Sequence, residues 1–481
     1  MAGSRRDLTA GRRTKIICTL GPATDPPGVM EDLLSRGMDA ARLNLSFGEI
    51  EEHAARIDRI RSLMGPTRRP VAVIADLPGR KVRLGALEGD EVHLRTGETV
   101  TFVRDSGQEG NAQQLPVDDA FFHDNMTRED IVLLSDGVVE LSVTKIGADA
   151  IEAKVVYGGD VSERTGVHAP GMPISGGPLT DEDLPYLKMC VEKEVDYIAL
   201  SHVVDQHDIL TVREKLQEMG SNIALIAKIE LSEAFARLDG ILRRADAVMI
   251  RRGDLGAQIE VTRVPLVQKE ILRLANQAGV PVIIATQMLG SMIDAPAPTR
   301  AEASDVSNAV ADGADGVLLS AETAIGKYPG ESAHMMARIV RETERERFER
   351  ATPTQTESYP SPFADTTASM ACHAAEQTRA KLIACFTESG RTARLVAKYR
   401  PTVPIIAFCS QDRTRRRLAI NWGVRSDRLD IVDDVEQMVR LVEERLTSRN
   451  LVGRGDRVAI VFGAPVGELG HTNSVRLHEI G

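Results

Sequence analysis

The chain has 481 residues, of which 42% are hydrophobic and 27% are charged, and its formal net charge is -11. This composition is typical of a globular protein of several domains, and the acidic balance argues against a nucleic-acid partner. No apolar run approaches the ~18 residues of a membrane span. The polar arm over residues 1–13 lacks the apolar segment of a secretory signal, and the five cysteines are scattered, so we expect a cytoplasmic protein without a membrane partner.

Eight short apolar runs predict eight buried strands. Most are followed by amphipathic stretches of helix length, such as 264–277, and the interior runs are rich in Ile, Val, Leu and Ala, which is typical of parallel strands buried on both faces. Eight strand–helix units favour an α/β fold of the TIM (β/α)8 barrel type over a doubly wound sheet. The runs are 14–20, 40–45, 70–75, 195–201, 223–227, 247–250, 281–285 and 316–320.

The barrel pattern is interrupted once and followed by a second α/β segment. Between the third and fourth runs, alternating apolar and polar residues with frequent turn signals predict a small all-β domain, a β-barrel cap over the carboxyl ends of the strands. After a proline-rich connector, a helix over 364–378 and strands over 382–386, 405–408 and 458–462 predict a C-terminal α/β domain. The expected domains are an N-terminal arm over 1–13, the barrel over 14–78 and 178–346, the cap over 79–177 and the C-terminal domain over 363–481.

Polar residues follow the predicted strands at the end where a barrel of this kind carries its catalytic groups. Lys228 and Glu230 follow the fifth run, and Asp254 follows the sixth. A lysine beside two carboxylates indicates a site for a divalent metal, Mg2+ in the first place, and an anionic oxygen. Taken alone, these residues could also simply end two strands in solvent. The other strand ends carry Arg42, Asn44, Ser46, Asp76, Ser201, His202, Thr286, Gln287, Ser320 and Glu322, and the whole set indicates phosphoryl transfer.

From about residue 13 to its C-terminus, the chain resembles the pyruvate kinase family in the order of its motifs and in its domain layout. Several motifs match in sequence order, which makes the resemblance specific. They are RLNLS at 42–46, KIE at 228–230, RGDLG at 252–256, ATQML at 285–289, PTRAE at 298–302 and SAETA at 320–324.

The resemblance implies transfer of a phosphoryl group from phosphoenolpyruvate to ADP, giving pyruvate and ATP in the last step of glycolysis. It implies that Glu230 and Asp254 hold Mg2+, or Mn2+ in its place, and that Lys228 and Arg42 neutralise the phosphate in transfer. The remaining roles that it implies are substrate binding by Gly253, Asp254 and Thr286, enolate protonation by Thr286 with Ser320 and Glu322, and nucleotide binding by Asn44, Arg83 and Arg164.

Two departures from the family pattern concern cations. Lys81 stands where potassium-requiring members carry Glu, and Leu77 lacks the hydroxyl of the family's potassium site. We expect the Lys81 ammonium to replace the monovalent cation of a site formed with Asn44, Ser46 and Asp76, so that potassium is not required. Arg251 replaces a small residue beside Asp254, where it would either crowd the substrate carboxylate or give it another partner.

The C-terminal domain contains a segment that resembles the family's effector-phosphate loop. We expect either a phosphorylated effector or a bare helix N-terminus there, and the resemblance suggests a homotetramer. Two other functions stay open: a catalytically weak regulatory paralogue that binds phosphometabolites, and a metal-dependent lyase that forms a pyruvate enolate. The loop residues are Thr387, Ser389, Gly390, Arg391 and Thr392.

Overall fold

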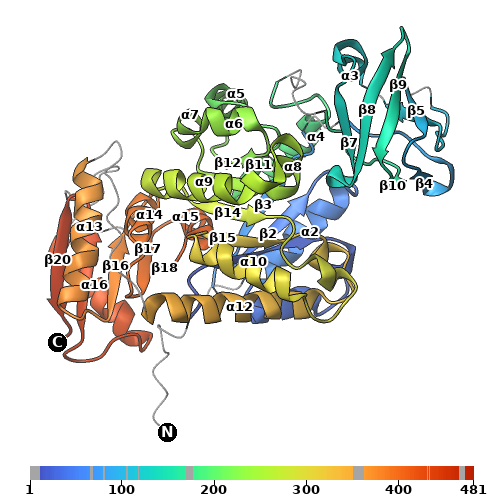
Figure 1. The fold of residues 1–481 in the computed structure, drawn as a ribbon. Coiled ribbons are helices and arrows are strands. Elements are labelled where there is room, and N and C mark those ends of the chain that lie inside the picture. The colour runs from blue at the N-terminus through green and yellow to red at the C-terminus, as the bar shows by residue number, and fades with distance from the viewer. Residues whose placement is uncertain are drawn as a thin grey trace.

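The computed structural model describes residues 11–64, 69–79, 82–104, 107–117, 119–169, 177–349, 362–430, 432, 434–464 and 472–481. Figure 1 shows a central body of strands and helices, with a sheet-rich body in cyan at one end and an α/β body in orange and red at the other. In the part of the chain that the structure describes, no helix is long and apolar enough to cross a membrane.

The central body is a closed barrel of eight parallel strands in the order β1-β15-β14-β13-β12-β11-β3-β2, which confirms the predicted fold class. Each predicted apolar run overlaps one strand, with ends that agree to within two residues. The strands are β1 (Lys15–Leu20), β2 (Ala40–Asn44), β3 (Ala72–Asp76), β11 (Tyr197–Leu200), β12 (Ala224–Ile229), β13 (Ala247–Arg251), β14 (Val282–Ala285) and β15 (Gly316–Leu319).

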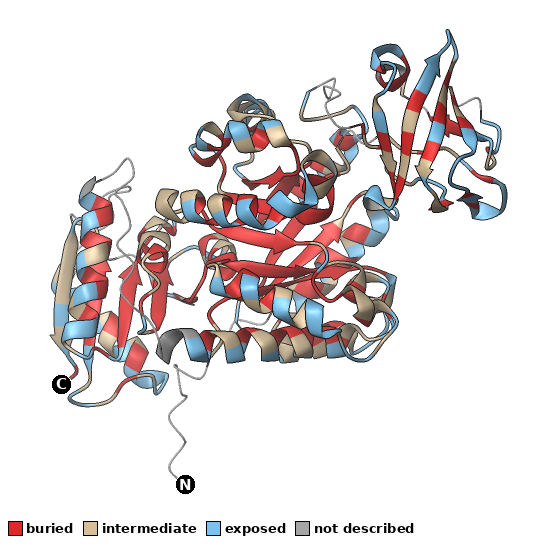
Figure 2. Ribbon diagram, in the orientation of Figure 1, coloured by how far each residue is buried: buried red, intermediate tan, exposed pale blue. Residues whose placement is uncertain are grey.

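Helices surround the barrel and turn their apolar faces to it. In α9, residues at helical spacing such as Val267, Ile271 and Leu272 are buried, and the helix ends at Gly279, whose φ of 69° is easily adopted without a side chain. Figure 2 shows buried strands inside and exposed outer helix faces. The helices are α1 (Val29–Arg36), α2 (Ile50–Leu63), α4 (Asp183–Glu192), α5 (Gln206–Glu218), α6 (Ser232–Ala236), α7 (Leu238–Leu242), α8 (Arg252–Gln258), α9 (Val264–Ala278), α10 (Arg300–Ala311), α11 (Ala321–Ala324) and α12 (Pro329–Glu349).

The inserted domain leaves the barrel after β3 and returns before α4. Its strands form a five-stranded sheet in the order β6-β5-β9-β8-β7 and a two-stranded sheet, β10-β4, in place of the single β-barrel that we expected. Isolated bridges such as Leu84 to Val117 join its segments without a continuous ladder. Its elements are β4 (Glu91–Leu94), β5 (Thr99–Arg104), β6 (Gln114–Val117), the short helix α3 (Ala120–Asn125), β7 (Ile131–Leu134), β8 (Val139–Ile146), β9 (Ala150–Tyr157) and β10 (Gly159–Ser162).

The C-terminal domain is a five-stranded sheet in the order β18-β17-β16-β19-β20 with helices against it. The sequence predicted β16, β17 and β19 but not the two edge strands, which are rich in polar residues and mostly not buried. The elements are α13 (Pro362–Gln377), β16 (Leu382–Phe386), α14 (Arg391–Lys398), β17 (Ile405–Cys409), α15 (Asp412–Arg417), β18 (Val424–Arg428), α16 (Val435–Ser448), β19 (Arg457–Phe462) and β20 (Ser474–Glu479).

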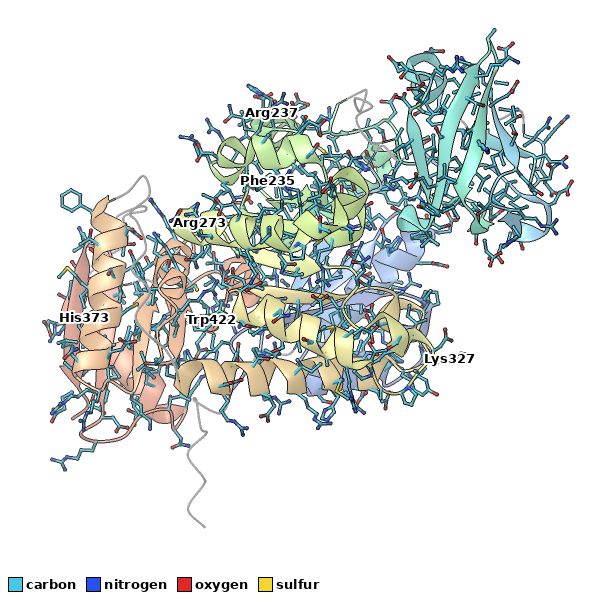
Figure 3. All side chains as sticks on the ribbon, in the orientation of Figure 1. Phe235, Arg237, Arg273, Lys327, His373 and Trp422 are labelled. Carbon is cyan, nitrogen blue, oxygen red and sulfur yellow. The ribbon has the colours of Figure 1, made fainter. Side chains whose placement is uncertain are left out.

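The C-terminal domain closes the amino end of the barrel, opposite to the strand ends that carry the candidate site. Ala419 and Ile420 pack into the same apolar cluster as the inward-facing strand residues. Lys15 Nζ donates to Val424 O at 2.7 Å. Trp422, labelled in Figure 3 where this domain meets the barrel, lies under the guanidinium of Arg400 at 4.9 Å. The C-terminal domain therefore covers the amino end of the barrel, whereas the carboxyl end carries the candidate site.

At the amino end of β2, Asp39 is 2% exposed and binds Arg12 Nη1 at 2.5 Å, the Ile16 N–H at 2.9 Å and Arg69 Nη2 at 3.0 Å. Burial raises the pKa of Asp39, but the charges of Arg12, Arg69 and Lys15 outweigh it and lower the pKa to about 2. A depressed carboxyl pKa stabilises the fold above the unfolded pKa of about 3.9 and ceases to do so as the pH falls to the folded value.

We therefore expect Asp39→Asn to lower the free energy of unfolding at pH 7 by about 3 kcal/mol, because the buried guanidinium of Arg12 loses its counter-charge. Urea unfolding of both proteins from pH 7 down to pH ~2 measures this, and the difference should shrink below pH ~4. Equal stability at pH 7 would contradict the assignment.

Candidate active site

A pocket lies between the carboxyl ends of the barrel strands and the inserted domain, and its volume is about 140 Å3. The 3-10 helix Ser135–Gly137 of the inserted domain packs against α8, so this domain closes over the strand ends. The pocket is polar because strand ends and loops supply most of its wall. The lining residues are Asn44, Ser46, Phe47, Arg83, Gly166, His168, Lys228, Arg251 and Asp254.

Lys228 lines this pocket from the end of β12 and is only 2% exposed. Its Nζ donates to Asp76 Oδ1 at 2.9 Å and lies 3.4 Å from Glu230 Oε1. A buried ammonium is costly unless it is paired and hydrogen-bonded. The two carboxylates therefore keep a positive charge at the wall of the pocket.

Asp76, at the end of β3, joins Lys228 to a second cation. Arg42 on the neighbouring strand donates to Asp76 Oδ2 from Nε at 2.8 Å, and its Nη1 donates to Thr19 Oγ1 at 3.1 Å. Burial raises the pKa of Asp76, but the charges of Lys228, Arg42 and Arg251 outweigh it and lower the pKa to about 2. Asp76 therefore remains an anion at neutral pH and holds both cations in place.

The two carboxylates predicted to bind a metal follow the neighbouring strands β12 and β13. Glu230 is fully buried, and its Oε2 accepts the His202 backbone N–H at 2.7 Å. Asp254, in the first turn of α8, is 5% exposed, and its Oδ1 lies 3.8 Å from His168 Nε2 of the inserted domain. Although Glu230 and Asp254 are far apart in sequence, they come to the same end of the barrel because β12 and β13 are parallel neighbours.

Arg251 lies between these carboxylates. Its Nη1 is 3.2 Å from Glu230 Oε1, and its Nε is 2.9 Å from Asp254 Oδ2. The side chain is 19% exposed and also lines the pocket. From the sequence we expected Arg251 either to crowd the substrate carboxylate or to give it another partner. In the structure Arg251 instead contacts the carboxylates of Glu230 and Asp254.

The carboxylate pair suits Mg2+ by its chemistry. Mg2+ prefers oxygen ligands and is usually bound through one or two carboxylates together with water and substrate oxygens. Among the described residues, no group of three or more His, Cys, Asp and Glu side chains is placed to hold a metal. Glu230 and Asp254 would therefore be the two ligands that these residues supply to the ion. Their oxygens fit Mg2+ once Arg251 no longer contacts them.

Thr286 and Gly253 bind each other. Thr286 follows β14 with a φ of 67°, and its Oγ1 donates to Ala285 O at 2.6 Å and accepts the Gly253 N–H at 3.1 Å. The Gly253 N–H that we expected to meet a substrate carboxylate is thus bonded within the protein. Thr286 anchors the start of α8 to the end of β14, and it is not among the residues that line the pocket.

Ser320 and Glu322 form a second anchored loop. Glu322 is 4% exposed; its Oε2 accepts the Ser320 N–H at 2.7 Å and its Oε1 accepts the Leu289 N–H at 3.1 Å. This carboxylate therefore ties the loop after β15 to the loop after β14. Neither Ser320 nor Glu322 is among the residues that line the pocket with Lys228.

The predicted nucleotide-binding residues lie at the side of the inserted domain. Arg83 Nη1 donates to Arg164 O at 2.9 Å, and its guanidinium lies 5.8 Å from the centre of the Phe47 ring. Burial, together with the charges of Arg164 and Arg251, lowers the pKa of Arg83. Asn44 and Arg83 line the pocket, and Arg164 is not among the lining residues. Phe47, 59% exposed, offers an apolar surface beside Arg83.

The predicted monovalent-cation site is only partly described. Lys81 lies outside the described residues. Asn44 and Ser46 line the pocket, whereas Asp76 is buried between Lys228 and Arg42. Leu77 is 2% exposed, and its apolar side chain has no atom that could bind a cation.

The predicted effector loop joins β16 to α14. Thr387 Oγ1 accepts the Gly390 N–H at 3.1 Å, and Ser389 Oγ accepts the Arg391 N–H at 3.4 Å. The Thr392 and Thr472 hydroxyls are 2.8 Å apart. The five residues thus form one compact turn at the start of a helix, and its hydroxyls are engaged within the domain.

Of the residues that the inserted domain contributes to the pocket wall, Arg83 was predicted from the sequence, whereas His168 and Gly166 were not. Their segment carries no motif, and the bridge from Leu133 to His168 that places it is formed between distant residues. No local sequence signal could have identified them.

Comparison with known proteins assigns the chain to a family. The model "Pyruvate kinase, barrel domain" matches residues 11–333, and "Pyruvate kinase, alpha/beta domain" matches residues 365–478. The pyruvate kinase of Mycobacterium tuberculosis (strain CDC 1551 / Oshkosh) is 38% identical over 470 residues, which cover 98% of this chain and 99% of that protein. The pyruvate kinase of Mycobacterium intracellulare is 39% identical with the same coverage, and that of Geobacillus stearothermophilus is 38% identical over 98% of this chain and 80% of its own length. The chain therefore belongs to the pyruvate kinase family of phosphotransferases.

Proposed function

We propose that the protein transfers the phosphoryl group of phosphoenolpyruvate to ADP and releases pyruvate and ATP. The observation that carries this proposal is a set of buried charges: Lys228 and Asp254 line one pocket, and the carboxylate of Glu230 is buried 3.4 Å from the Lys228 Nζ. With a divalent cation on the two carboxylates, this set would carry the positive charge that attracts a multiply charged phosphate ester and stabilises its transition state. Family membership supports the same reaction.

The cations would act on the phosphoryl group. Lys228 would neutralise negative charge on the oxygens in transfer, because its ammonium is held at the pocket wall by Asp76 and Glu230. Arg42, held on the same Asp76, would add a second positive charge to the phosphate subsite. Asn44, Arg83 and Arg164 would receive the nucleotide on the side of the inserted domain.

Glu230 and Asp254 would hold Mg2+, or Mn2+ in its place, and the ion would supply Lewis-acid polarisation of substrate oxygens. The enolate left after transfer needs a proton at carbon. We assign its delivery to the loops of Thr286, Ser320 and Glu322, whose hydrogen bonds order the ends of β14 and β15. In this geometry the Thr286 hydroxyl donates to Ala285 O and would have to turn toward the pocket.

The test of the proposed function is pyruvate release from phosphoenolpyruvate and ADP with and without Mg2+. We expect turnover that depends on all three components. Absence of pyruvate under every condition, with phosphometabolite binding intact, would favour the regulatory paralogue, and pyruvate formation without nucleotide would favour a lyase.

Lys228→Met should lower kcat by about 10²- to 10³-fold, because an uncharged side chain cannot stabilise the phosphoryl group in transfer. The fold should persist, since Asp76 keeps Arg42 as its partner. Steady-state kinetics with circular dichroism measures both effects. The control is Lys269→Met, at a side chain that is 56% exposed and pairs with Asp312. A kcat within the range of this control would contradict the role of Lys228.

The activity should be the same in sodium-only and potassium buffers, because the Lys81 ammonium is proposed to replace the monovalent cation. Lys81→Glu should convert the enzyme to one that needs potassium chloride, whereas Lys81→Ala, which adds no carboxylate, should not gain that response. Strong potassium stimulation of the unaltered protein would refute the assignment of Lys81.

We further propose, from family membership, a homotetramer that works in the cytoplasm and takes a phosphorylated effector at the Thr387–Thr392 loop. Light scattering of the purified protein measures the oligomer, and activation by phosphorylated sugars or nucleotides tests the effector.

A further inference from the structure

Arg251 occupies the space between the two proposed metal ligands. Its guanidinium contacts Glu230 through Nη1 at 3.2 Å and Asp254 through Nε at 2.9 Å. Both acceptor oxygens belong to side chains that are at most 5% exposed. Buried carboxylates need a counter-charge, and in this arrangement Arg251 supplies one to each of them.

A divalent ion and this guanidinium compete for the same oxygens. Glu230, Asp254 and Asp76 carry three negative charges. Lys228, Arg251 and Arg42 carry three positive charges, so this cluster is already balanced. A metal added to the balanced cluster would face two cations within a few ångströms, where repulsion is strong and weakly screened. The ion therefore gains its ligands only if Arg251 gives them up.

The structure leaves Arg251 a place to go. Its side chain is 19% exposed, more than either carboxylate, and it lines a pocket of about 140 Å3 that also contains Asn44 and Ser46. Its backbone is ordinary extended chain with φ -102° and ψ 96°, so no strain holds the side chain in one rotamer. The long arginine can turn from the carboxylates into the pocket while its backbone stays in β13.

We propose that Arg251 is an internal counter-cation that occupies the divalent-metal position of the metal-free protein and is displaced when the metal binds. This inference rests on the proposed metal-dependent reaction and adds to it a residue that controls how tightly the site binds the metal. Arg251 raises the metal concentration that the site requires. Once displaced, it becomes an additional positive charge in the substrate pocket.

The direct test is Mn2+ binding to the full-length protein without phosphoenolpyruvate or ADP, measured by electron paramagnetic resonance of the free ion. Arg251→Met keeps most of the side-chain volume and removes the charge, and Arg251→Ala removes both. Both variants should bind Mn2+ about tenfold or more tightly than the unaltered protein, because close charge pairs of this kind couple strongly.

The matched control is Arg237→Met. Arg237 is 56% exposed, lies 3.7 Å from Asp205 Oδ2, and is labelled in Figure 3 on the outer side of the barrel helices. Its loss should leave Mn2+ affinity unchanged. Equal Mn2+ affinity in Arg251→Met, Arg251→Ala and the unaltered protein would overturn the proposal, and so would weaker binding in both variants.

Thermal unfolding provides a second readout that a permanent ion pair would not give. Without metal, Arg251→Met should melt lower than the unaltered protein, and saturating Mn2+ should raise its melting temperature more than it raises that of the unaltered protein. A loss of stability that Mn2+ does not restore would overturn the displacement. Since neither experiment contains substrate, failure of pyruvate formation and failure of this inference are distinguishable.

Discussion

The requirement that buried charges be paired shapes the whole mouth of this barrel. Asp76, Arg42, Lys228 and Glu230 are each at most 6% exposed, and an isolated ion at that depth would be prohibitively costly. The protein meets the requirement by spreading the charges over neighbouring strands, so that each strand end completes the partner set of the next. The same network leaves Lys228, Arg251 and Asp254 at the wall of a polar pocket, with Glu230 buried against Lys228 and Arg251.

The closed parallel barrel makes this network attainable from residues far apart in sequence. In the register of β2 and β3, Asn44 is opposite Asp76. Arg42 lies two residues before Asn44 on β2, and its side chain reaches the Asp76 carboxylate. The ends of β12 and β13 bring Lys228 and Arg251 to the same mouth. The inserted domain then covers this mouth, and the C-terminal domain seals the opposite end with Ala419 and Ile420. Chemistry is thereby confined to one face.

The sequence was most informative where one physical rule dominates. Strands buried on both faces must be apolar, so the eight barrel strands, β16, β17 and β19 could be predicted, whereas the polar edge strands β18 and β20 could not. The family and the fold class are confirmed. Strand-end position predicted that Lys228 and Asp254 share a pocket. It also grouped Thr286 and Glu322 with them; these two residues are hydrogen-bonded to backbone groups and are not among those that line the pocket. The contacts of Arg251 depend on a side-chain rotamer, which no sequence pattern encodes.

The central claim is that Glu230 and Asp254 hold a divalent metal at the position where Arg251 lies without it. Anomalous diffraction from crystals soaked in manganese chloride tests this most directly. We expect one strong peak within coordination distance of both carboxylates, with the Arg251 guanidinium turned into the pocket. A peak elsewhere, or no peak while Arg251 remains on both carboxylates, would contradict it.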